Sequence, residues 1–600
     1  MLIVKRENKI AESTKRIART LSLQQSLILD IMKNIKKIFQ IGLASIGLVC
    51  SIESANAQLI STHFFGENAW MPDTVGNANA CQEPPCILYG KLHQQWGAIK
   101  SSKTTIVRYG GIAPDRNMPT DYQYIRIIDS IRANGMEPMI QVPFYNYRYT
   151  AQQAAEIVQY INVTKGKNIK YWIIGNEPDL SYSFTTAAQI ANYFKPFASA
   201  MKAIDPTILI VGPEFASFNQ TIMNGLTTPN GPDDITGKDP AGRYYLDVIS
   251  FHCYPFDGNQ NRAQVVSKLT QAYQLQDNLI YLNSRVATCN SAHARTGASK
   301  LKTAITEANI NWQNNASDNL NGLGANSFIG AQFVSEMMGI GLKHGLDIFN
   351  LWSVVEGNTT ATNIGFINGS NGQKKPLYYQ FKLMAENFTG SYVDGITNQI
   401  NVKSFGSQNA QEVSVLILNE DLTNNYNAKI RLSSTPIVGS NILKINIDAG
   451  IESEYDDVIG SQSSVLLTFN SAGTIIRRSE YSLTGNAMAN LPPTVTEFLT
   501  TGIVSEITLE SGPFVINNIF PNPSSGAFTV EMNKINAQEK GFEIKIYNLI
   551  GQEVYNKKGA FLNGKEGVEL DPSIANGTYI VSIKENEVDN YMTKKIVVLK

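Results

Sequence analysis

Short apolar runs alternate with amphipathic stretches from residue 59 to residue 352. Most runs are continuously apolar, which is typical of strands buried on both faces, as in a parallel sheet. The stretches between them repeat apolar residues at helical spacing, for example over 122–133, 151–160 and 186–203. The expected strands are residues 59–62, 105–108, 138–142, 171–174, 208–211, 248–251, 303–306 and 347–351.

Eight strand–helix units within roughly 300 residues predict an α/β fold, a (β/α)8 TIM barrel, which we place at residues 58–388. The competing arrangement is a doubly wound open sheet. Such a sheet normally carries a glycine-rich phosphate turn after an early strand, and the sequence has none there. The pattern therefore favours the closed barrel.

The pattern changes after residue 388. Segments such as 413–418, 428–432, 442–447 and 464–469 alternate apolar and polar residues between turns rich in Asn, Asp, Gly and Ser. This alternation predicts an antiparallel β-sandwich at residues 389–509, followed by a linker at 510–513. The remaining chain, to residue 600, has the pattern of a second, small β-sandwich.

That last stretch contains IFPNPSSG at 519–526, FEIKIYNLIG at 542–551 and NGTYI at 576–580, before a basic and apolar tail. Over residues 510–600 it resembles the C-terminal sorting domain of the type IX secretion system. The resemblance implies the type IX secretion machinery as a partner, and export across the outer membrane of a Gram-negative bacterium. It also implies a secreted or cell-surface location, and nothing about catalysis.

The N-terminal region, residues 1–57, has the three-part plan of a secretory signal peptide. Lysines at positions 33, 36 and 37 precede an apolar run over 38–50, and small residues at 55–57 offer a cleavage site. The polar stretch before Met32 does not belong to this plan, so we expect Met32 to be the true start. No later stretch has the roughly 18 consecutive apolar residues of a transmembrane span.

The charge balance and the cysteine and histidine positions argue against nucleic acid, metals and cofactors as binding partners. The 600 residues carry 50 Lys and Arg against 51 Asp and Glu, whereas nucleic-acid binding normally needs a basic surplus. Cysteines and histidines show no ligand-like spacing, so no metal and no cofactor are expected. Cys81 and Cys86 flank a rigid QEPP spacer and are candidates for a local disulfide. For Cys253 and Cys289, a disulfide and buried thiols both stay open.

Two carboxylates are notable because each terminates an apolar run. Glu177 follows the fourth expected strand in YWIIGNEP (171–178), and Glu307 ends the seventh in LKTAITEAN (301–309). In a closed barrel the carboxyl ends of all strands meet at one rim, where active sites lie. Two carboxyl groups facing one cleft can divide the work of glycoside hydrolysis, one as acid/base and one as nucleophile. A lone glutamate there can also be a helix cap or a surface ion pair.

This pair resembles the catalytic signature of glycoside hydrolase clan A, retaining enzymes built on (β/α)8 barrels, and the resemblance covers residues 59–390. It implies Glu177 as acid/base and Glu307 as nucleophile. In VRYGG (107–111) it implies an arginine near the nucleophile, and in SFHCYP (250–255) a tyrosine that hydrogen-bonds it. The further site residues that it implies are Arg108, His252, Tyr254 and Trp352, the last as an apolar platform for a sugar.

Other polar and aromatic residues are expected at the same rim. Asn176 is placed to donate to a sugar 2-hydroxyl, and Glu214, after the fifth strand, is expected to support the site or contact substrate. Tyr145, Tyr147 and Trp70 lie on expected rim loops, where aromatic faces stack against sugars. Any of these aromatic residues can also be ordinary core or loop packing.

Within the clan, RYGG (108–111), NEPDL (176–180) and TEAN (306–309) are similar to motifs of family 44 endoglucanases and xyloglucanases. Families 39, 51 and 79, which include xylosidases, arabinofuranosidases and glucuronidases, carry related runs. Ala308 departs from the aromatic residue that follows the nucleophile in family 44. The family and the sugar therefore stay open.

The sequence predicts a secreted, monomeric, retaining β-glycoside hydrolase that acts on a polysaccharide or oligosaccharide. The alternative is a non-catalytic carbohydrate-binding protein or adhesin on the same barrel, although such barrels usually lose one carboxylate. Metal or phosphate chemistry would need clusters of His and Asp ligands that the sequence does not show.

Overall fold

The computed structural model describes residues 58–498, apart from 71–72, 74–90, 269–273, 316–317 and 357–362, and residues 514–599, apart from 523, 535–540, 549–551, 560–563 and 586–590. The signal-peptide region, the pair Cys81 and Cys86, and the linker at 510–513 lie outside the described residues. The chain divides into two compact units, residues 1–500 and 501–600. No helix in the described part is both long and apolar enough to span a membrane.

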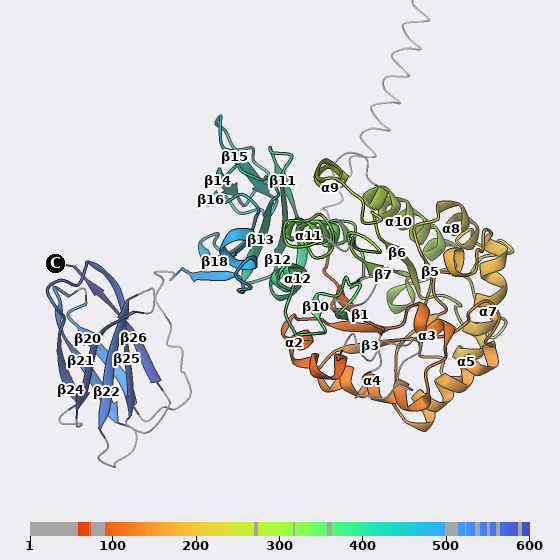
Figure 1. The fold of residues 1–600 in the computed structure, drawn as a ribbon, viewed down its shortest axis with the longest axis horizontal. Coiled ribbons are helices and arrows are strands. Elements are labelled where there is room, and N and C mark those ends of the chain that lie inside the picture. Colours follow the sequence, from red (N-terminus) through yellow and green to blue (C-terminus); the bar gives the residue numbers. More distant parts are fainter. Residues whose placement is uncertain are drawn as a thin grey trace, which may run out of the picture. The chain divides into compact units, whose positions relative to one another are not determined.

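The first unit contains the predicted closed barrel, in which eight parallel strands pair in chain order and helices surround them (Figure 1). The strands are β1 (Phe65–Ala69), β2 (Ile106–Tyr109), β3 (Glu137–Val142), β4 (Tyr171–Ile174), β5 (Leu209–Phe215), β6 (Val248–Cys253), β7 (Lys302–Ala308) and β8 (Ile348–Leu351). The main helices are α2 (Trp96–Ser101), α3 (Ile112–Arg116), α4 (Asp121–Ala133), α5 (Ala151–Val158), α6 (Pro178–Ser181), α7 (Ala187–Ile204), α8 (Gln220–Leu226), α9 (Arg262–Lys268), α10 (Gln274–Ala292), α11 (Phe328–Lys343) and α12 (Pro376–Asn387). A short pair, β9 (Val355–Glu356) and β10 (Ile367–Asn368), follows β8.

The first barrel strand is not the one that the apolar pattern predicts. Leu59 is 73% exposed and forms a bridge with Ser391 instead of joining the barrel. The strand that pairs with β2 and β8 is β1, whose sequence FGENA contains glycine and two polar residues. A search for continuous apolar runs passes over β1, because polar residues occupy buried positions in it.

Side chains inside the barrel form an apolar floor and a polar upper layer. Since successive side chains of a strand point to opposite faces, residues two apart share the barrel interior. Interior positions near the strand starts are apolar, and they form a cluster of their own with Ile106, Met139, Ile173, Val248, Ala304 and Ile348. Two residues further along, the strands carry Arg108, Gln141, Ser250, Thr306 and Asn350, all fully buried.

The helices begin where local sequence signals place them. Thr120, Thr150 and Thr186 each accept a hydrogen bond from the backbone three residues on, and a glutamine there reaches back to the cap. These three capping boxes fix the starts of α4, α5 and α7. The helices confirm the amphipathic stretches that the sequence predicts.

The second part of the first unit is a sheet of nine strands around its own apolar core. Strand β11 pairs with β12 through its first half and with β15 through its second half, so the sheet folds over at Gly395. One neighbouring pair, β14 and β15, is parallel, so the predicted antiparallel pattern is wrong at this point. The strands are β11 (Ser391–Thr397), β12 (Val402–Gln408), β13 (Glu412–Asn419), β14 (Tyr426–Arg431), β15 (Leu443–Ile447), β16 (Glu454–Ile459), β17 (Ser463–Asn470), β18 (Ile475–Ser482) and β19 (Thr494–Glu497).

Helix α11 joins the barrel to this sheet. Its residues from Phe328 to Leu342 are all buried. The side-chain amide of Gln332 donates to the Ser463 carbonyl (2.9 Å) and the Ser464 hydroxyl (3.2 Å). A Cβ at Gly339 would lie 2.3 Å from the Phe405 ring, so only glycine allows this close approach. Barrel and sheet therefore share one packed interface.

The second unit is a sandwich of two antiparallel sheets, with strand orders β20-β21-β24 and β23-β22-β25-β26. Apolar residues of both sheets, among them Val530, Ile544 and Val581, form one core. The predicted small β-sandwich is therefore confirmed. Its strands are β20 (Phe514–Phe520), β21 (Ala527–Lys534), β22 (Phe542–Asn548), β23 (Glu553–Gly559), β24 (Lys565–Glu569), β25 (Gly577–Glu585) and β26 (Tyr591–Val598).

Candidate active site

The barrel strands are irregular where they reach the rim. Register shifts occur between Gly212 and Phe215 of β5, between Phe251 and His252 of β6, and between Ile305 and Ala308 of β7. Bulges of this kind re-aim side chains and are frequent beside active sites. Beyond the β6 shift, His252 stands directly opposite Glu307.

Arg108 is the centre of the hydrogen-bond network at the rim. It is fully buried, and its Nη1 donates to Glu307 Oε1 (2.8 Å) and Asn68 Oδ1 (2.9 Å). Its Nη2 donates to Asn176 Oδ1 (2.8 Å) and Glu214 Oε2 (2.9 Å). One planar guanidinium thus fixes side chains from four other strands or their loops, which a lysine could not do.

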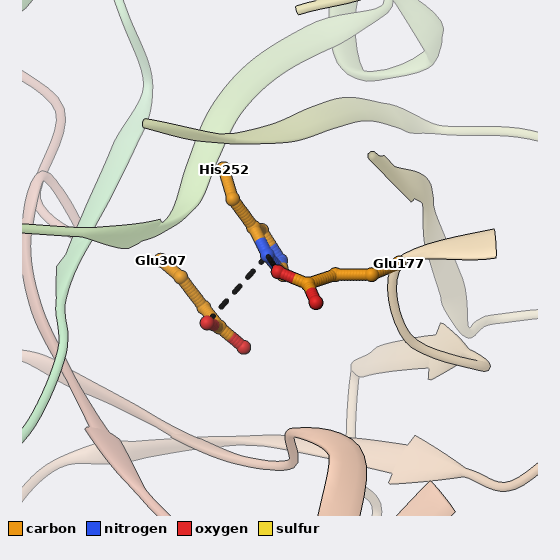
Figure 2. Close-up of side chains that lie close together, drawn as sticks. All are labelled: Glu177, His252 and Glu307. Carbon is orange, nitrogen blue, oxygen red and sulfur yellow. Dashed lines mark hydrogen bonds and ion pairs between the residues drawn. The ribbon is translucent and has the colours of Figure 1, made fainter. Parts of the chain in front are cut away.

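His252 lies between the two predicted catalytic carboxylates (Figure 2). Its Nδ1 is 2.9 Å from Glu177 Oε1 and 3.5 Å from Glu307 Oε2, while Nε2 is 3.4 Å from Glu214 Oε2. Burial alone would lower the pKa of His252, but the charge of Glu307 and the hydrogen bonds with Glu177 and Glu214 outweigh it and raise that pKa to about 10. The imidazole is therefore a cation at neutral pH.

Glu214 is held as a permanent anion. Burial favours its neutral form, but the charge of Arg108 and the hydrogen bonds from His252 and Ser250 lower its pKa to about 2. Ser250 Oγ donates to Oε1 at 2.5 Å and Thr306 Oγ1 at 2.7 Å. With both oxygens hydrogen-bonded and fully buried, Glu214 does not exchange protons near neutral pH.

Glu307 lies deeper in the rim than Glu177. Tyr254 donates its hydroxyl hydrogen to Glu307 Oε2 (2.8 Å), and Arg108 donates to the other oxygen. Burial raises the pKa of Glu307, the cations His252 and Arg108 lower it, and the charge of Glu177 raises it further, so that the pKa lies above its ordinary value. If Glu177, Glu214 and Glu307 are all ionised, the rim carries three negative charges against the two positive charges of its arginine and histidine. One further proton on a carboxylate makes the group neutral.

Glu177 sits in a strained backbone conformation. Its φ of 47° and ψ of 57° lie in the left-handed region, which is unfavourable for a residue with a side chain. Its N–H donates to the Glu214 carbonyl (2.9 Å), and the Ser181 N–H donates back to the Glu177 carbonyl (2.6 Å). Its side chain is 17% exposed, against 7% for Glu307, so Glu177 is the carboxylate more open to solvent.

Trp352 follows β8, and Gly111 supports its indole ring. A Cβ at Gly111 would lie 2.6 Å from the ring, and the φ of +107° at this position also requires glycine. Trp352 is partly buried. The structure places it at the rim, and its role as an apolar platform for a sugar stays a prediction.

The other predicted aromatic residues take different positions. Trp70 donates its Nε1 hydrogen to Glu356 Oε1 at 3.2 Å, in the short strand β9 that follows β8. Tyr145 packs edge-on to Tyr182 and beneath the guanidinium of Arg116, and Tyr147 is 59% exposed. The structure does not bring Tyr145 or Tyr147 into contact with either glutamate.

Four network residues were not predicted from the sequence. Asn68 donates to the Thr306 and Leu351 carbonyls, and Gln141 binds the backbone of Gly111 in both directions. Ser250 and Thr306 complete the set through Glu214. For Gln141, Ser250 and Thr306, the signal that could have found them is the two-residue alternation inside the barrel, because each lies two residues after an apolar interior residue. Asn68 follows Gly66 and has no such signal.

Glu177, His252 and Glu307 also lie close enough together to form a metal site. One donor atom from each lies within 4.8 Å of the others. A histidine ligand must be neutral, whereas His252 is protonated by its carboxylate neighbours, and Arg108 already supplies a second positive charge. The positive charges of His252 and Arg108 therefore disfavour a metal cation at this group and favour proton transfer by its side chains.

No disulfide joins Cys253 to Cys289. Cys289 is buried, and its Sγ hydrogen points to the Thr227 carbonyl, 3.1 Å away. Of the two alternatives left open by the sequence, the structure therefore does not show the disulfide between these two residues.

Several solved structures are similar to this chain in fold. CelM2, a bifunctional glucanase-xylanase from a metagenome library, is 17% identical, with a TM-score of 0.46, over 69% of this chain and 97% of that one. Cel44A, a family 44 endoglucanase from Clostridium thermocellum, is 13% identical, with a TM-score of 0.46, over 69% of this chain and 98% of that one. A bacterial orthologue of human α-L-iduronidase is 12% identical, with a TM-score of 0.43, over 90% and 97%.

Sequence comparisons concern smaller parts of the chain. An ulvan lyase, NLR42, of Nonlabens ulvanivorans is 28% identical over 93 residues, which are 15% of this chain and 16% of that protein. Residues 518–599 match the family described as a secretion system C-terminal sorting domain. The C-terminal unit is therefore a type IX sorting domain, as predicted, and the protein is secreted or displayed at the cell surface.

Proposed function

We propose that this protein is a retaining β-glycoside hydrolase in which Glu177 is the acid/base and Glu307 the nucleophile. The observation that carries the proposal is the pair itself: two carboxylates on one barrel rim, bridged by a buried histidine cation (Figure 2). The substrate would be a polysaccharide or oligosaccharide bound across this rim.

The spacing of the pair supports retention of configuration. One oxygen of Glu177 and one of Glu307 lie within 4.8 Å of each other. Retaining enzymes hold their carboxyl groups about 5–5.5 Å apart, whereas inverting enzymes need roughly 6.5–9.5 Å to admit a water. This proximity of the nearest oxygens favours the shorter, retaining arrangement, in which Glu307 would attack the sugar directly.

The proposed reaction runs in two steps. In the first, Glu307 forms a bond to the anomeric carbon while the bond to the leaving oxygen breaks and Glu177 gives its proton to that oxygen. In the second, Glu177 takes a proton from water, the water oxygen attacks the anomeric carbon, and Glu307 is released. Arg108 and Tyr254 hold Glu307 in place for attack, and Trp352 offers an apolar face to the sugar.

Two substitutions test the proposal, with a third as control. Glu177→Gln and Glu307→Gln should each lower kcat/KM by at least about 1,000-fold on natural glycans. Glu137→Gln, at the opposite end of the barrel in β3, should remain active. A panel of β-glucans, xylans, mannans and aryl glycosides supplies the substrates. Full activity in either rim variant would overturn the assignment.

Chemical rescue assigns the two roles separately. With Glu307→Gly, azide should restore turnover and give a glycosyl azide of inverted anomeric configuration. With Glu177→Gly, azide should give a product of retained configuration, because the glycosyl-enzyme has already formed. A wild-type protein that binds glycans and hydrolyses none of the panel would instead favour the carbohydrate-binding alternative.

A further inference from the structure

A buried pair of side chains, Asp115 and Tyr182, lies next to the turn that carries Glu177. Asp115, in α3, is fully buried, and Tyr182, the residue after α6, is 8% exposed. The Tyr182 hydroxyl donates its hydrogen to Asp115 Oδ2. Its oxygen accepts a long hydrogen bond (3.5 Å) from the backbone N–H of Asn176. Hydrogen bonds thus connect Asp115, through the tyrosine, to the residue before Glu177.

The pair contacts the turn on both sides of Glu177. Before it, a Cβ at Gly175 would lie 3.5 Å from the Tyr182 hydroxyl and 3.9 Å from Asp115 Oδ1, so the backbone packs directly on the two polar groups. After it, Tyr182 ends the one-turn helix α6, in which the Ser181 N–H donates to the Glu177 carbonyl (2.6 Å). The left-handed φ of 47° at Glu177 persists only where its surroundings hold it.

Asp115 also holds a second rim segment, the loop after β3. The Phe144 N–H donates to Asp115 Oδ1 (2.9 Å), and the next three residues, 145–147, all have positive φ. The Tyr182 ring packs edge-on against the Phe144 ring, with centroids 5.3 Å apart. Burial raises the pKa of Asp115 to about 6, although the hydrogen bonds from Tyr182 and from the Phe144 backbone lower it. A carboxyl group is costly to bury, so packing alone does not account for an aspartate here.

We propose that Tyr182 and Asp115 are positioning residues for the acid/base, because they hold the turn that directs Glu177 toward the leaving oxygen. This inference rests on the proposed function. Among the described residues, the Glu177 side chain has one hydrogen-bond partner, His252, whereas the Glu307 side chain has two. The position of the acid/base therefore depends more on its backbone than the position of the nucleophile does.

Leaving groups of different basicity isolate this role. 2,4-Dinitrophenolate leaves without a proton, whereas a sugar hydroxyl needs one from the acid/base. The probes are 2,4-dinitrophenyl β-cellobioside and cellotetraose, with the corresponding xylobioside and xylotetraose as a second pair. Tyr182→Phe and Asp115→Asn should each lower kcat/KM about 10- to 100-fold on the tetrasaccharide. Both should leave kcat/KM for the dinitrophenyl glycoside within about threefold of the wild type.

Azide provides a second readout that a loss of folded protein would not give. With the dinitrophenyl glycoside, hydrolysis of the glycosyl-enzyme becomes the slow step, since the acid/base must still take a proton from water. The kcat of Tyr182→Phe on this substrate should therefore fall about 10-fold. Azide attacks the anomeric carbon without releasing a proton, so it should restore kcat.

Tyr193→Phe is the matched control. Tyr193 belongs to the same buried aromatic group and stacks on Phe144 with ring centroids 3.9 Å apart, but its hydroxyl has no hydrogen-bond partner in the described chain. Its removal should leave kcat/KM unchanged on both substrates. Thermal unfolding of all variants identifies those that fold, and Asp115→Asn, which keeps the side-chain volume, carries the test if Tyr182→Phe does not fold.

Equal losses of kcat/KM on the two substrates in either folded variant, or no loss on the tetrasaccharide, would overturn the inference and leave the proposed function intact. Glu177→Gln supplies the reference, because it removes the transferred proton itself. If Glu177→Gln does not spare the dinitrophenyl glycoside relative to the tetrasaccharide, the proposed role of Glu177 fails, and the inference fails with it.

Discussion

Two groups of buried carboxylates in the first unit differ in how their negative charge is compensated by cations and hydrogen bonds. At the barrel rim, Glu214 and Glu307 accept hydrogen bonds from Arg108, and His252 adds a second cation. Where α11 meets the nine-stranded sheet, Glu336 and Glu420 are equally buried. There, three carboxylate oxygens have no hydrogen-bond partner in the described chain: both oxygens of Glu420 and Oε2 of Glu336.

Two cations act on this second group: Lys403 lies 3.7 Å from Glu420, and Arg262 donates to the Glu420 carbonyl. Burial outweighs the charges of Lys403 and Arg262 and raises the pKa of Glu420 to about 7. Burial and the charge of Glu420 together raise the pKa of Glu336 well above its ordinary value. At the rim, cations hold Glu214 in its charged form, whereas at the interface burial favours the protonated form of Glu336 and Glu420. The same residue type is thus stabilised as an anion in one place and destabilised as an anion in the other.

Removal of the rim cation should have the largest effect. Arg108→Met leaves Glu214 and Glu307 buried without their counter-charge, so we expect the free energy of unfolding to fall by about 3–5 kcal/mol, with loss of hydrolysis. Arg477→Met, which breaks an exposed pair with Glu497, should change it by less than about 1 kcal/mol. Denaturant titration measures both, and equal stability of the two variants would contradict the charge-balance argument.

Replacing the buried carboxyl group of Glu420 with a neutral amide should have the opposite effect and stabilise the protein. Because the pKa of Glu420 in the folded state is about 7 against an ordinary 4.5, the folded protein binds this proton more tightly than the unfolded chain. Stability attributable to Glu420 therefore falls as pH rises from 4.5 to 7 and stays low above that range. Glu420→Gln should raise the free energy of unfolding at pH 8 by roughly 2–3 kcal/mol and change it little at pH 4.5.

Thermal unfolding of wild type and Glu420→Gln between pH 4.5 and 8 measures this difference. Glu497→Gln, in an exposed ion pair, is the control and should follow the wild-type curve. Parallel curves for wild type and Glu420→Gln would show that the interface carboxyl does not titrate in this range.

A substitution at Gly111, which lies against the indole of Trp352, should have a smaller and more local effect at the rim. Gly111→Ala places a methyl group within 2.6 Å of the indole at a φ of +107°, so we expect kcat/KM to fall about 10- to 100-fold as the ring moves. Gly97→Ala, in α2 with no atom within 4 Å of the new Cβ, should leave activity unchanged and stabilise the helix by about 0.5–1 kcal/mol. A fully active Gly111→Ala enzyme would remove the indole from the proposed sugar site.

The smallest perturbation is titration of the histidines themselves. With its pKa raised to about 10, His252 should show constant imidazole ¹⁵N shifts from pH 5 to 8, whereas His63 and His344, whose pKa values burial lowers, should titrate below 6.5. His252→Gln assigns the signal. Titration of His252 near 6.5 would mean that the neighbouring carboxylates do not hold this imidazole as a cation.

The apolar pattern predicted seven of the eight barrel strands within a few residues, because those strands are buried on both faces. It missed β1, where Asn68 and Glu67 are buried within a strand of mixed polarity. Arg108, His252, Tyr254 and Glu307 could be placed at the rim because each closes an apolar run. Their roles are still a proposal, but their proximity is now observed.

Other features had no local signal. Asn68 and Gln141 act through contacts with distant strands, and the pairing of Glu336 with Glu420 depends on how α11 packs on the sheet. A single sequence records neither the register of strands nor the face that one element presents to another. The bulges that turn His252 toward Glu307 belong to the same class of information.

The burial of α11 has a consequence for anyone who would shorten this protein. A chain cut after the barrel, near residue 388, would expose one side of a helix that is apolar almost all round, and would leave Gln332 without its acceptors. Such a fragment should aggregate. The sorting unit, in contrast, has a core of its own. A shortened chain that keeps the barrel folded therefore has to include the nine-stranded sheet.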